Sequence, residues 1–267
     1  LDRMNRLNPT FPYEMIEATN PCGEQPLPPY DSCNLGSINL CQFVKLPLPD
    51  DFAITEPSAG IDWERLARTI HAAVHFLDNV IDLNRYPIPQ IEEQTKRNRR
   101  IGLGVMGWAD LLAKLGLPYN HELAFSLGEQ VMAFIESEAR NQSSELASKR
   151  GRFPNWVNSI YRRQEMSMRN ATVTTVAPTG TISIIAGCSS GIEPFYAIAF
   201  SRNVLDGTRM TEVNPTFREA AQRLGFYSDE LAQRLLGSRS ISGFIDIPET
   251  VRAVFLTAAD ISPQDHV

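Results

Sequence analysis

Apolar residues recur at steps of three and four positions between residues 61 and 83. They are Trp63, Leu66, Ile70, Val74, Leu77 and Ile81. This spacing places them on one face of an α-helix, which makes a turn every 3.6 residues or so. Asp62 lies just before the first of them and is a residue type that caps helix N-termini. The pattern therefore predicts an amphipathic helix over 61–83 that is capped by Asp62.

Three further segments, 121–149, 214–225 and 248–260, have helical patterns with recognisable ends. The first has an apolar face formed by Leu123, Leu127, Val131 and Ile135. The residues expected to cap, start or stop the three helices are, in order, Asn120, Gly151 and Pro154; Asn214 and Pro215; and Pro248.

Four short segments are rich in β-branched and apolar residues and are predicted to be strands: 38–44, 171–177, 195–200 and 240–247. The Pro-, Asn- and Gly-rich stretch 8–36 is predicted to be mostly loop, and 47–60 a surface connection. Strands alternate with helices along the chain. This order is typical of an α/β fold with a largely parallel sheet.

The composition narrows the class of protein. The chain has 267 residues, is 43% hydrophobic and carries a net charge of −6. It can bury a sizeable core, and its acidic balance argues against a general nucleic-acid-binding surface. No apolar run approaches the ~20 residues that cross a bilayer, and the first residues lack the apolar core of a signal peptide. We therefore expect a cytoplasmic location, and we interpret Leu1 at the start as a sign of an internal piece.

The four cysteines, Cys22, Cys33, Cys41 and Cys188, are expected to be reduced thiols in that compartment. No C-x-x-C pair occurs and no histidine has the spacing of a zinc ligand, so a structural zinc site is not predicted. Cys188 is expected to be a packing residue.

The stretch GLGVMG, Gly102 to Gly107, matches the G-x-G-x-x-G pattern of dinucleotide-binding loops. The residues before it, KRNRRI, are too charged for the buried strand that should precede such a loop, although WADLLAKLG after it suits a helix. A nicotinamide-dependent oxidoreductase is the low-ranked alternative. Close backbone packing at the glycines is the preferred interpretation.

The stretch APTGTISIIAGCSSGIEP, residues 177–194, follows a predicted strand and is rich in Gly, Ser and Thr. Backbone N–H groups and hydroxyls in such a turn can bind an anion such as phosphate. An ordinary strand-to-helix turn is an equally good interpretation on these grounds. No G-K-[ST] sequence is present, so it is not a Walker A loop.

The stretch NPCGE, residues 20–24, combines a proline that fixes φ with a glycine that permits unusual dihedrals. A tight turn is predicted, with Cys22 at its tip between Asn20 and Glu24. A neighbouring carboxylate disfavours the thiolate, so Cys22 is a poor protease-type nucleophile. A neutral thiol suits hydrogen-atom exchange, and Glu24 could then deprotonate a substrate hydroxyl. A buried structural cysteine in a proline-rich turn is the alternative.

Four stretches, in order, resemble the large chain of ribonucleotide reductases, most closely the adenosylcobalamin-dependent class II enzymes. They are NPCGEQPLPPYDSCNLGSINL, RRIGLGVMGWADLL, VAPTGTISIIAGCSSGIEP and AADISPQDHV. The resemblance implies a ten-stranded α/β barrel built from two five-stranded halves, with a finger loop through its centre. Residues 1–267 would then form a single partial catalytic domain, the second half of the barrel. Its finger loop would span about 18–36 and its phosphate-binding turn about 177–194.

The resemblance also implies roles for individual residues. Cys22 would carry the thiyl radical that abstracts the 3′-hydrogen of a ribonucleotide. Glu24 would accept the 3′-hydroxyl proton, Asn20 would hydrogen-bond the ribose, and Cys33 would be one of two reducing thiols. The substrate phosphates would bind at Pro178, Thr179, Gly180, Thr181, Ile182 and Ser183. No metal-ligating residue is implied.

The implied cofactor is adenosylcobalamin, and the implied product is a deoxyribonucleotide for DNA synthesis. The implied partners are a ribonucleoside di- or triphosphate, a thioredoxin- or glutaredoxin-type reductant, and allosteric dNTP or ATP at sites outside this chain. The full-length protein would be a homodimer that binds neither nucleic acid nor membrane, and the present polypeptide would be inactive alone. A class I large chain fed by a separate radical-generating subunit remains open, as does a truncated homologue that only binds.

Overall fold

A computed structural model describes residues 1–45, 56–203 and 209–266, and it divides the chain into two compact units. The first comprises residues 1–38, 64–105 and 131–178. The second comprises residues 39–63, 106–130 and 179–267. The expectation of a single partial domain stays a prediction, and each unit is described by itself.

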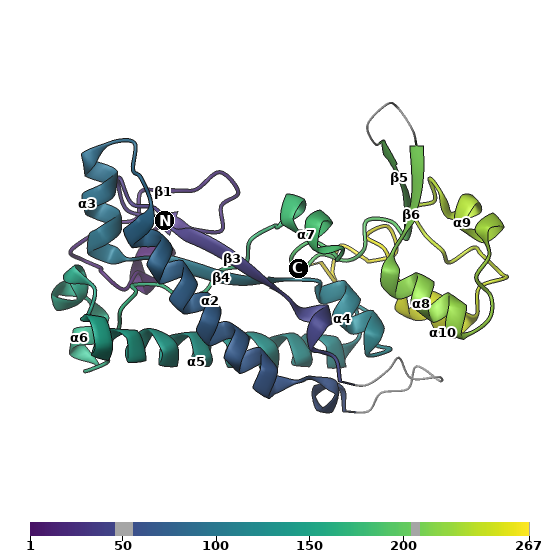
Figure 1. The fold of residues 1–267 in the computed structure, drawn as a ribbon, viewed down its shortest axis with the longest axis horizontal. Helices are drawn as coiled ribbons and strands as arrows, with labels where there is room; N and C mark the ends of the chain where they lie inside the picture. Colours follow the sequence, from purple (N-terminus) through teal and green to yellow (C-terminus); the bar gives the residue numbers. More distant parts are fainter. Residues whose placement is uncertain (46–55, 204–208, 267) are drawn as a thin grey trace. The chain divides into compact units, whose positions relative to one another are not determined.

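The first unit is built around the long helices α2 (Trp63–Leu83) and α5 (Glu122–Arg150), most of which belong to it. The apolar positions predicted for the first helix are buried from Leu66 to Ile81, as are Val131 and Ile135 of α5. His71 of α2 and Glu138 of α5 are hydrogen-bonded at 2.7 Å, and Figure 1 shows the two helices crossing there. Both helix predictions are confirmed. Most of the apolar residues that recur at steps of three and four positions are the ones that the two helices bury.

Strand β4 (Ile101–Met106) is buried along its whole length and pairs with β3 (Asn34–Asn39), as Figure 1 shows. Residues 171–177 lie along β4, with a parallel bridge between Leu103 and Thr174. The backbone bonds run from Ile101 N to Thr172 O, from Leu103 N to Val173 O and from Thr175 N to Leu103 O. The predicted strand 171–177 is therefore an extended segment with one bridge.

The remaining elements of the first unit are short. Strands β1 (Ala18–Thr19) and β2 (Pro26–Leu27) form an antiparallel hairpin within the predicted loop. The helices are α1 (Asp2–Leu7), α3 (Pro89–Asn98), the 3₁₀ helix η3 (Pro154–Asn158) and α6 (Ile160–Arg163).

The second unit packs helices against the antiparallel hairpin β5 (Ala199–Asn203) and β6 (Arg209–Val213). Its other elements are η1 (Leu40–Phe43), η2 (Pro57–Gly60), α4 (Trp108–Lys114), α7 (Gly180–Ala186), α8 (Pro215–Arg223), α9 (Asp229–Leu235) and α10 (Glu249–Val254). Its core is mostly aliphatic and contains three buried phenylalanines: Phe217 and Phe255 meet edge to face at 5.3 Å, and Phe195 stacks on Phe255 at 6.0 Å.

Helix boundaries agree with several of the sequence signals. Asn214 caps α8 by accepting a hydrogen bond from Phe217 N, and Pro215 is its first residue. Gly151 follows α5 with φ +86°. At the other end of α5 the prediction is wrong, because Leu123 N donates to His121 Nδ1 and Asn120 hydrogen-bonds Asp265 instead. Helix α10 begins after Pro248 but ends at Val254.

Several strand predictions are wrong. The strand expected at 38–44 is β3 to residue 39 and then η1, where Asn39 Oδ1 accepts from Cys41 N and starts a turn. Residues 240–247 form turns, and β5 begins only at Ala199. The sheets β1–β2 and β5–β6 are antiparallel, so a largely parallel sheet is not observed. No closed barrel is present in the described residues, and much of the predicted connection 47–60 lies outside them.

Candidate active site

The tight turn predicted at NPCGE is present as the tip of the β1–β2 hairpin. Asn20 closes it three times: its N–H donates to Gln25 O, its backbone oxygen accepts from Gly23 N, and its side-chain Oδ1 accepts from Gln25 N at 3.0 Å. Gly23 has φ +85°, a conformation that favours glycine. Cys22 is exposed at the tip. The turn thus presents a thiol to the outside and keeps the Asn20 amide oxygen for its own closure.

Glu24 occupies an unusual position on the same turn. Its backbone oxygen accepts a hydrogen bond of 3.1 Å from the Thr175 hydroxyl. Its side-chain atom Oε2 is buried and has no hydrogen-bond partner in the described residues. A buried carboxylate oxygen without a donor is costly, so such an atom is typical of a site that a ligand completes. The residue expected to act as a base therefore has an unused acceptor.

Cys33 lies just before β3 and is half-buried. Burial raises the pKa of its thiol, and the charges of Asp31 and Glu24 raise it further, against the opposing effect of Arg100. Cys33 is thus close enough to Glu24 for their charges to interact. The thiol is held in its neutral form at neutral pH.

A buried ion pair supports the segment that carries Cys33. Arg100 is 1% exposed, and its Nε donates to Asp31 Oδ2 at 2.7 Å. The Asn98 amide donates to the same oxygen at 2.7 Å, and Ser32 N donates to Asp31 Oδ1 at 2.9 Å. Sequence reasoning missed this pair. The charged run KRNRR was its one visible signal, and the run was used only to argue against a buried strand before GLGVMG.

Gly102 and Gly104 of GLGVMG lie within strand β4 instead of forming a loop, and Gly107 lies between that strand and helix α4. A Cβ at Gly102 would come within 2.7 Å of Gln25 Nε2, and one at Gly104 within 2.8 Å of Thr175 O. The charged residues before the strand form helix α3. These observations exclude the dinucleotide-binding loop and confirm close packing at the glycines. They also show why the hairpin can lie against β4.

The predicted phosphate turn begins with Pro178, the last residue of the first unit, and continues in the second. Thr179 has the left-handed φ of +55° and precedes α7. The first α-helical hydrogen bond there is from Ser183 N to Thr179 O, so the N–H groups of residues 180–182 have no acceptor in the helix. Gly180, Thr181 and Ile182 are exposed, whereas Thr179 and Ser183 are buried.

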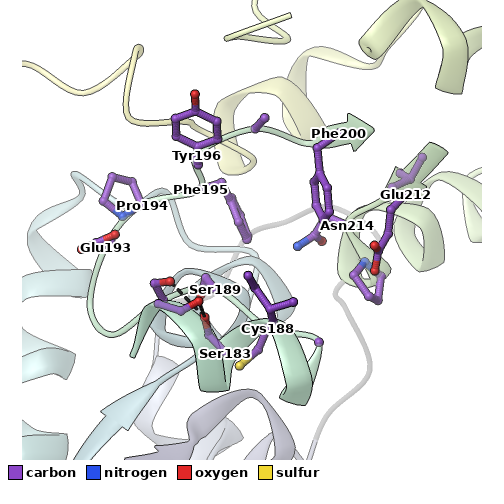
Figure 2. Close-up of a pocket in the computed structure, with 17 residues that line it drawn as sticks. Ser183, Cys188, Ser189, Glu193, Pro194, Phe195, Tyr196, Phe200, Glu212 and Asn214 are labelled. Atoms are coloured by element: carbon purple, nitrogen blue, oxygen red, sulfur yellow. Dashed lines mark hydrogen bonds between the residues drawn. The ribbon is translucent and has the colours of Figure 1, made fainter. Parts of the chain in front are cut away.

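A pocket of about 300 Å³ lies beside this turn, within the second unit. One wall comes from α7 and the residues after it, including Ser183, Cys188 and Ser189, and the other from residues 193–200 and 212–215. Figure 2 shows Phe195 and Phe200 on that second wall, with Asn214 and Glu212 near them. The lining is aromatic with a few polar groups, as in small-molecule sites.

The remaining thiols are less accessible than Cys22. Burial raises the pKa of Cys188 to about 12 and also raises the pKa of Cys41. Cys188 lines the pocket, so the expectation that it only packs is incomplete. In the part of the chain that is described, no three His, Cys, Asp or Glu side chains are grouped as metal ligands would be. None of the described helices is long and apolar enough to cross a membrane.

The geometry can be compared with known proteins. Residues 1–267 match the family described as "Ribonucleotide reductase, barrel domain". The vitamin B12-dependent ribonucleoside-diphosphate reductase of Thermoplasma acidophilum is 49% identical over 267 residues, all of this chain and 33% of that protein. Its namesake in Mycobacterium tuberculosis (strain CDC 1551 / Oshkosh) is 48% identical over 267 residues, again all of this chain and 37% of that protein. The chain thus spans about a third of the length of these relatives.

More distant similarity extends to other reductases. The ribonucleoside-diphosphate reductase subunit alpha of Chlamydia pneumoniae is 30% identical over 270 residues, covering 87% of this chain and 25% of that protein. In a solved structure, the Actinobacillus ureae class Id ribonucleotide reductase alpha subunit has a similar fold, with a TM-score of 0.72 at 22% identity. That match covers 99% of this chain and 47% of that chain.

Proposed function

The chain belongs to the ribonucleotide reductase family, whose barrel domain it matches over residues 1–267, and we propose that it carries the radical centre of a ribonucleotide-reducing enzyme. The observation that carries this proposal is the hairpin tip. It combines an exposed Cys22 with a buried, unpartnered Glu24 Oε2. Hydrogen-atom abstraction next to a hydroxyl requires a thiol and a nearby oxygen that can accept the hydroxyl proton. The Cys22 thiol and Glu24 Oε2 provide both on one turn.

In the proposed reaction Cys22, as a thiyl radical, takes the 3′-hydrogen of the ribose and becomes a thiol. Glu24 Oε2 accepts the proton of the 3′-hydroxyl, and the Nδ2 group of Asn20 donates to a ribose oxygen because its Oδ1 is engaged with Gln25 N. The 2′-hydroxyl then leaves as water after taking a proton from one of the two reducing thiols, and Glu24 returns its proton to the 3′-oxygen at the end of the cycle. Cys22 finally returns the hydrogen atom to C3′.

The two reducing equivalents come from a pair of thiols that ends as a disulfide. Cys33 is one of them. Its high pKa suits a thiol that delivers hydrogen atoms instead of acting as a nucleophile. A thioredoxin- or glutaredoxin-type dithiol then reduces the disulfide. We expect no turnover by residues 1–267 alone.

The substrate is a ribonucleoside di- or triphosphate whose phosphates bind at residues 178–183. Gly180, Thr181 and Ile182 support this, since these residues are exposed and their N–H groups have no helical acceptor. The enzyme supplies deoxyribonucleotides for DNA synthesis. It is cytoplasmic and homodimeric at full length, and dNTP or ATP regulates it from sites outside this chain. The described units are parts of the ten-stranded barrel of its family.

The radical originates with adenosylcobalamin, in keeping with the B12 dependence in the names of the relatives at 49% and 48% identity. When bound, this cofactor supplies an organic radical that oxidises a thiol. The residues present fit that chemistry, because Cys22 is exposed and Gly23 has open space around it. Cys22 would face the cofactor, and no residue of this chain is assigned as its ligand. A class I large chain is the second candidate, supported by the 30% identical alpha subunit. Activity of the full-length protein with and without adenosylcobalamin separates the two.

The test of the radical role uses the full-length protein with Cys22→Ser and, as a control, Cys41→Ala. The serine O–H bond is too strong for the exchange, so Cys22→Ser should abolish deoxyribonucleotide formation and leave the ribonucleotide Kd within about twofold. The control should retain turnover. Reduction at the normal rate by Cys22→Ser would reject the proposal.

A further inference from the structure

Residues Ser189, Ser190 and Gly191, here called the strap, lie in the second unit between the phosphate turn and helix α4. On the α4 side the strap is bonded through its backbone. Ser189 N donates to Asp110 Oδ2 at 2.6 Å, and Ser189 O accepts from Gly107 N at 2.8 Å. This side of the strap is therefore fixed to the start of α4.

On its other side the strap contacts the turn itself. Gly191 N donates to Thr179 Oγ1 at 2.7 Å, and the hydroxyls of Ser190 and Ser183 are 3.0 Å apart. Figure 2 shows the Ser183 hydroxyl facing the strap at the edge of the pocket. Thr179 has a φ of +55°, which a β-branched residue rarely adopts. Such a conformation persists only where neighbours impose it, and the bond from Gly191 is one of those constraints.

Asp110 anchors the strap. Its side chain is buried, and besides Ser189 N its carboxylate accepts from Asn214 Nδ2 at 3.0 Å and from Thr216 Oγ1 at 2.9 Å. Three donors satisfy the charge, so the carboxylate has a defined position. Gly107, whose N–H donates to Ser189 O, has φ +72°, and a Cβ there would come within 2.5 Å of Asn39 Oδ1.

We propose that Asp110 and the strap are positioning residues that hold the 179–183 turn in the conformation that binds the substrate phosphates. The inference deepens the proposed function and rests on it. None of these residues touches the reacting atoms. Their effect passes from Asp110 to Ser189, then along the strap to Thr179 and Ser183, and so to the N–H groups of residues 180–182.

The test uses the full-length protein and compares two hydrogen bonds of the second unit. One joins the strap to the turn, and the other joins Asp110 to helix α8. Ser190→Ala removes the bond between the Ser190 and Ser183 hydroxyls, one of the two strap–turn bonds, and Ser190→Thr keeps the hydroxyl. Thr216→Val removes the bond of 2.9 Å from the Thr216 hydroxyl to Asp110 Oδ1, on the α8 side and away from the turn. We expect Ser190→Ala to weaken ribonucleotide and inorganic pyrophosphate binding by about five- to tenfold, the value of one hydrogen bond. Its KM should rise with kcat nearly unchanged.

The phosphate dependence separates positioning from mere stability. A nucleoside without phosphates should bind wild type and Ser190→Ala equally. Ser190→Thr should restore pyrophosphate binding. Thr216→Val should lower Tm and leave pyrophosphate binding unchanged. Equal pyrophosphate binding by wild type and Ser190→Ala overturns the inference, as does failure of wild type to bind pyrophosphate. If wild type binds pyrophosphate but forms no deoxyribonucleotide, the proposed function fails while the binding comparison still decides the role of the strap.

Discussion

The Thr175 hydroxyl donates a hydrogen bond of 3.1 Å to the backbone oxygen of Glu24, joining two residues that are 151 positions apart. Thr175 is itself bonded to β4 through its N–H, which donates to Leu103 O. The hairpin tip that carries Cys22 is therefore tied to the most buried strand of the first unit.

Removing this tie should loosen the tip without unfolding the unit. We predict that Thr175→Val lowers kcat of the full-length enzyme by about tenfold, equivalent to ~1.4 kcal/mol in the barrier, because Glu24 loses its fixed position. Thr172→Val is the matched control, since it removes the Thr172 bond to Ile101 O in the same segment. Steady-state kinetics would measure both. Equal losses in the two variants would show that the segment matters only for folding.

We expect the Glu24 carboxylate to lower the stability of the chain and to be required for reduction. In Glu24→Gln the buried, unpartnered atom belongs to a neutral amide, which costs less to bury than a carboxylate oxygen. We predict that the free energy of unfolding of the 267-residue chain rises by about 1 kcal/mol, measured in urea. Reduction by the full-length variant should be lost. A less stable variant would mean that Glu24 Oε2 has a partner in solution.

The four thiols should react with iodoacetamide in a defined order. Cys22 is exposed and should be labelled first at neutral pH. Burial raises the pKa of Cys33, Cys41 and Cys188, so their thiolate fractions are small at neutral pH and grow as the pH rises. Labelling of Cys188 should increase toward pH values near its pKa of about 12. Peptide mass spectrometry at several pH values would measure this, and Cys33 labelling as fast as Cys22 at pH 7 would contradict it.

The glycine positions of β4 should not tolerate a methyl group. Gly104→Ala would place a Cβ 2.8 Å from the Thr175 backbone oxygen, which cannot move without disturbing the pairing. We predict a destabilisation of about 1–3 kcal/mol in chemical unfolding. Gly243→Ala is the control, because no atom lies within 4 Å of its Cβ position. Similar stability of the two variants would refute the packing role.

Sequence patterns predicted the fold where one local rule decides the structure. Helices α2, α5 and α8 follow from apolar periodicity, and the cap of α8 from Asn214. Strand prediction failed because a short apolar run does not specify a partner: residues 40–43 turn once Asn39 bonds to Cys41 N, and 240–247 find no neighbouring strand.

In the candidate site, too, sequence patterns predicted the local features and missed the contacts between distant parts of the chain. The turn with Asn20, Cys22 and Glu24 could be predicted because Pro21 and Gly23 act locally. Contacts across long chain separations could not, and they include the Thr175 bond and the Arg100–Asp31 pair beside Cys33. The roles assigned to Cys33 and to residues 178–183 stay predictions, since they depend on chemistry with a bound substrate.

The bare glycines of β4 also bear on how precisely the thiol is held. Because Gly102 and Gly104 have no side chains, the Gln25 side chain of the hairpin and the Thr175 backbone oxygen lie directly against the main chain of the strand. Main-chain atoms have no rotamers to exchange, so little slack remains at this contact. In the proposed reaction the Cys22 sulfur returns a hydrogen atom to the same carbon on every cycle, and a rigid strand beneath the hairpin would keep that sulfur in a constant position.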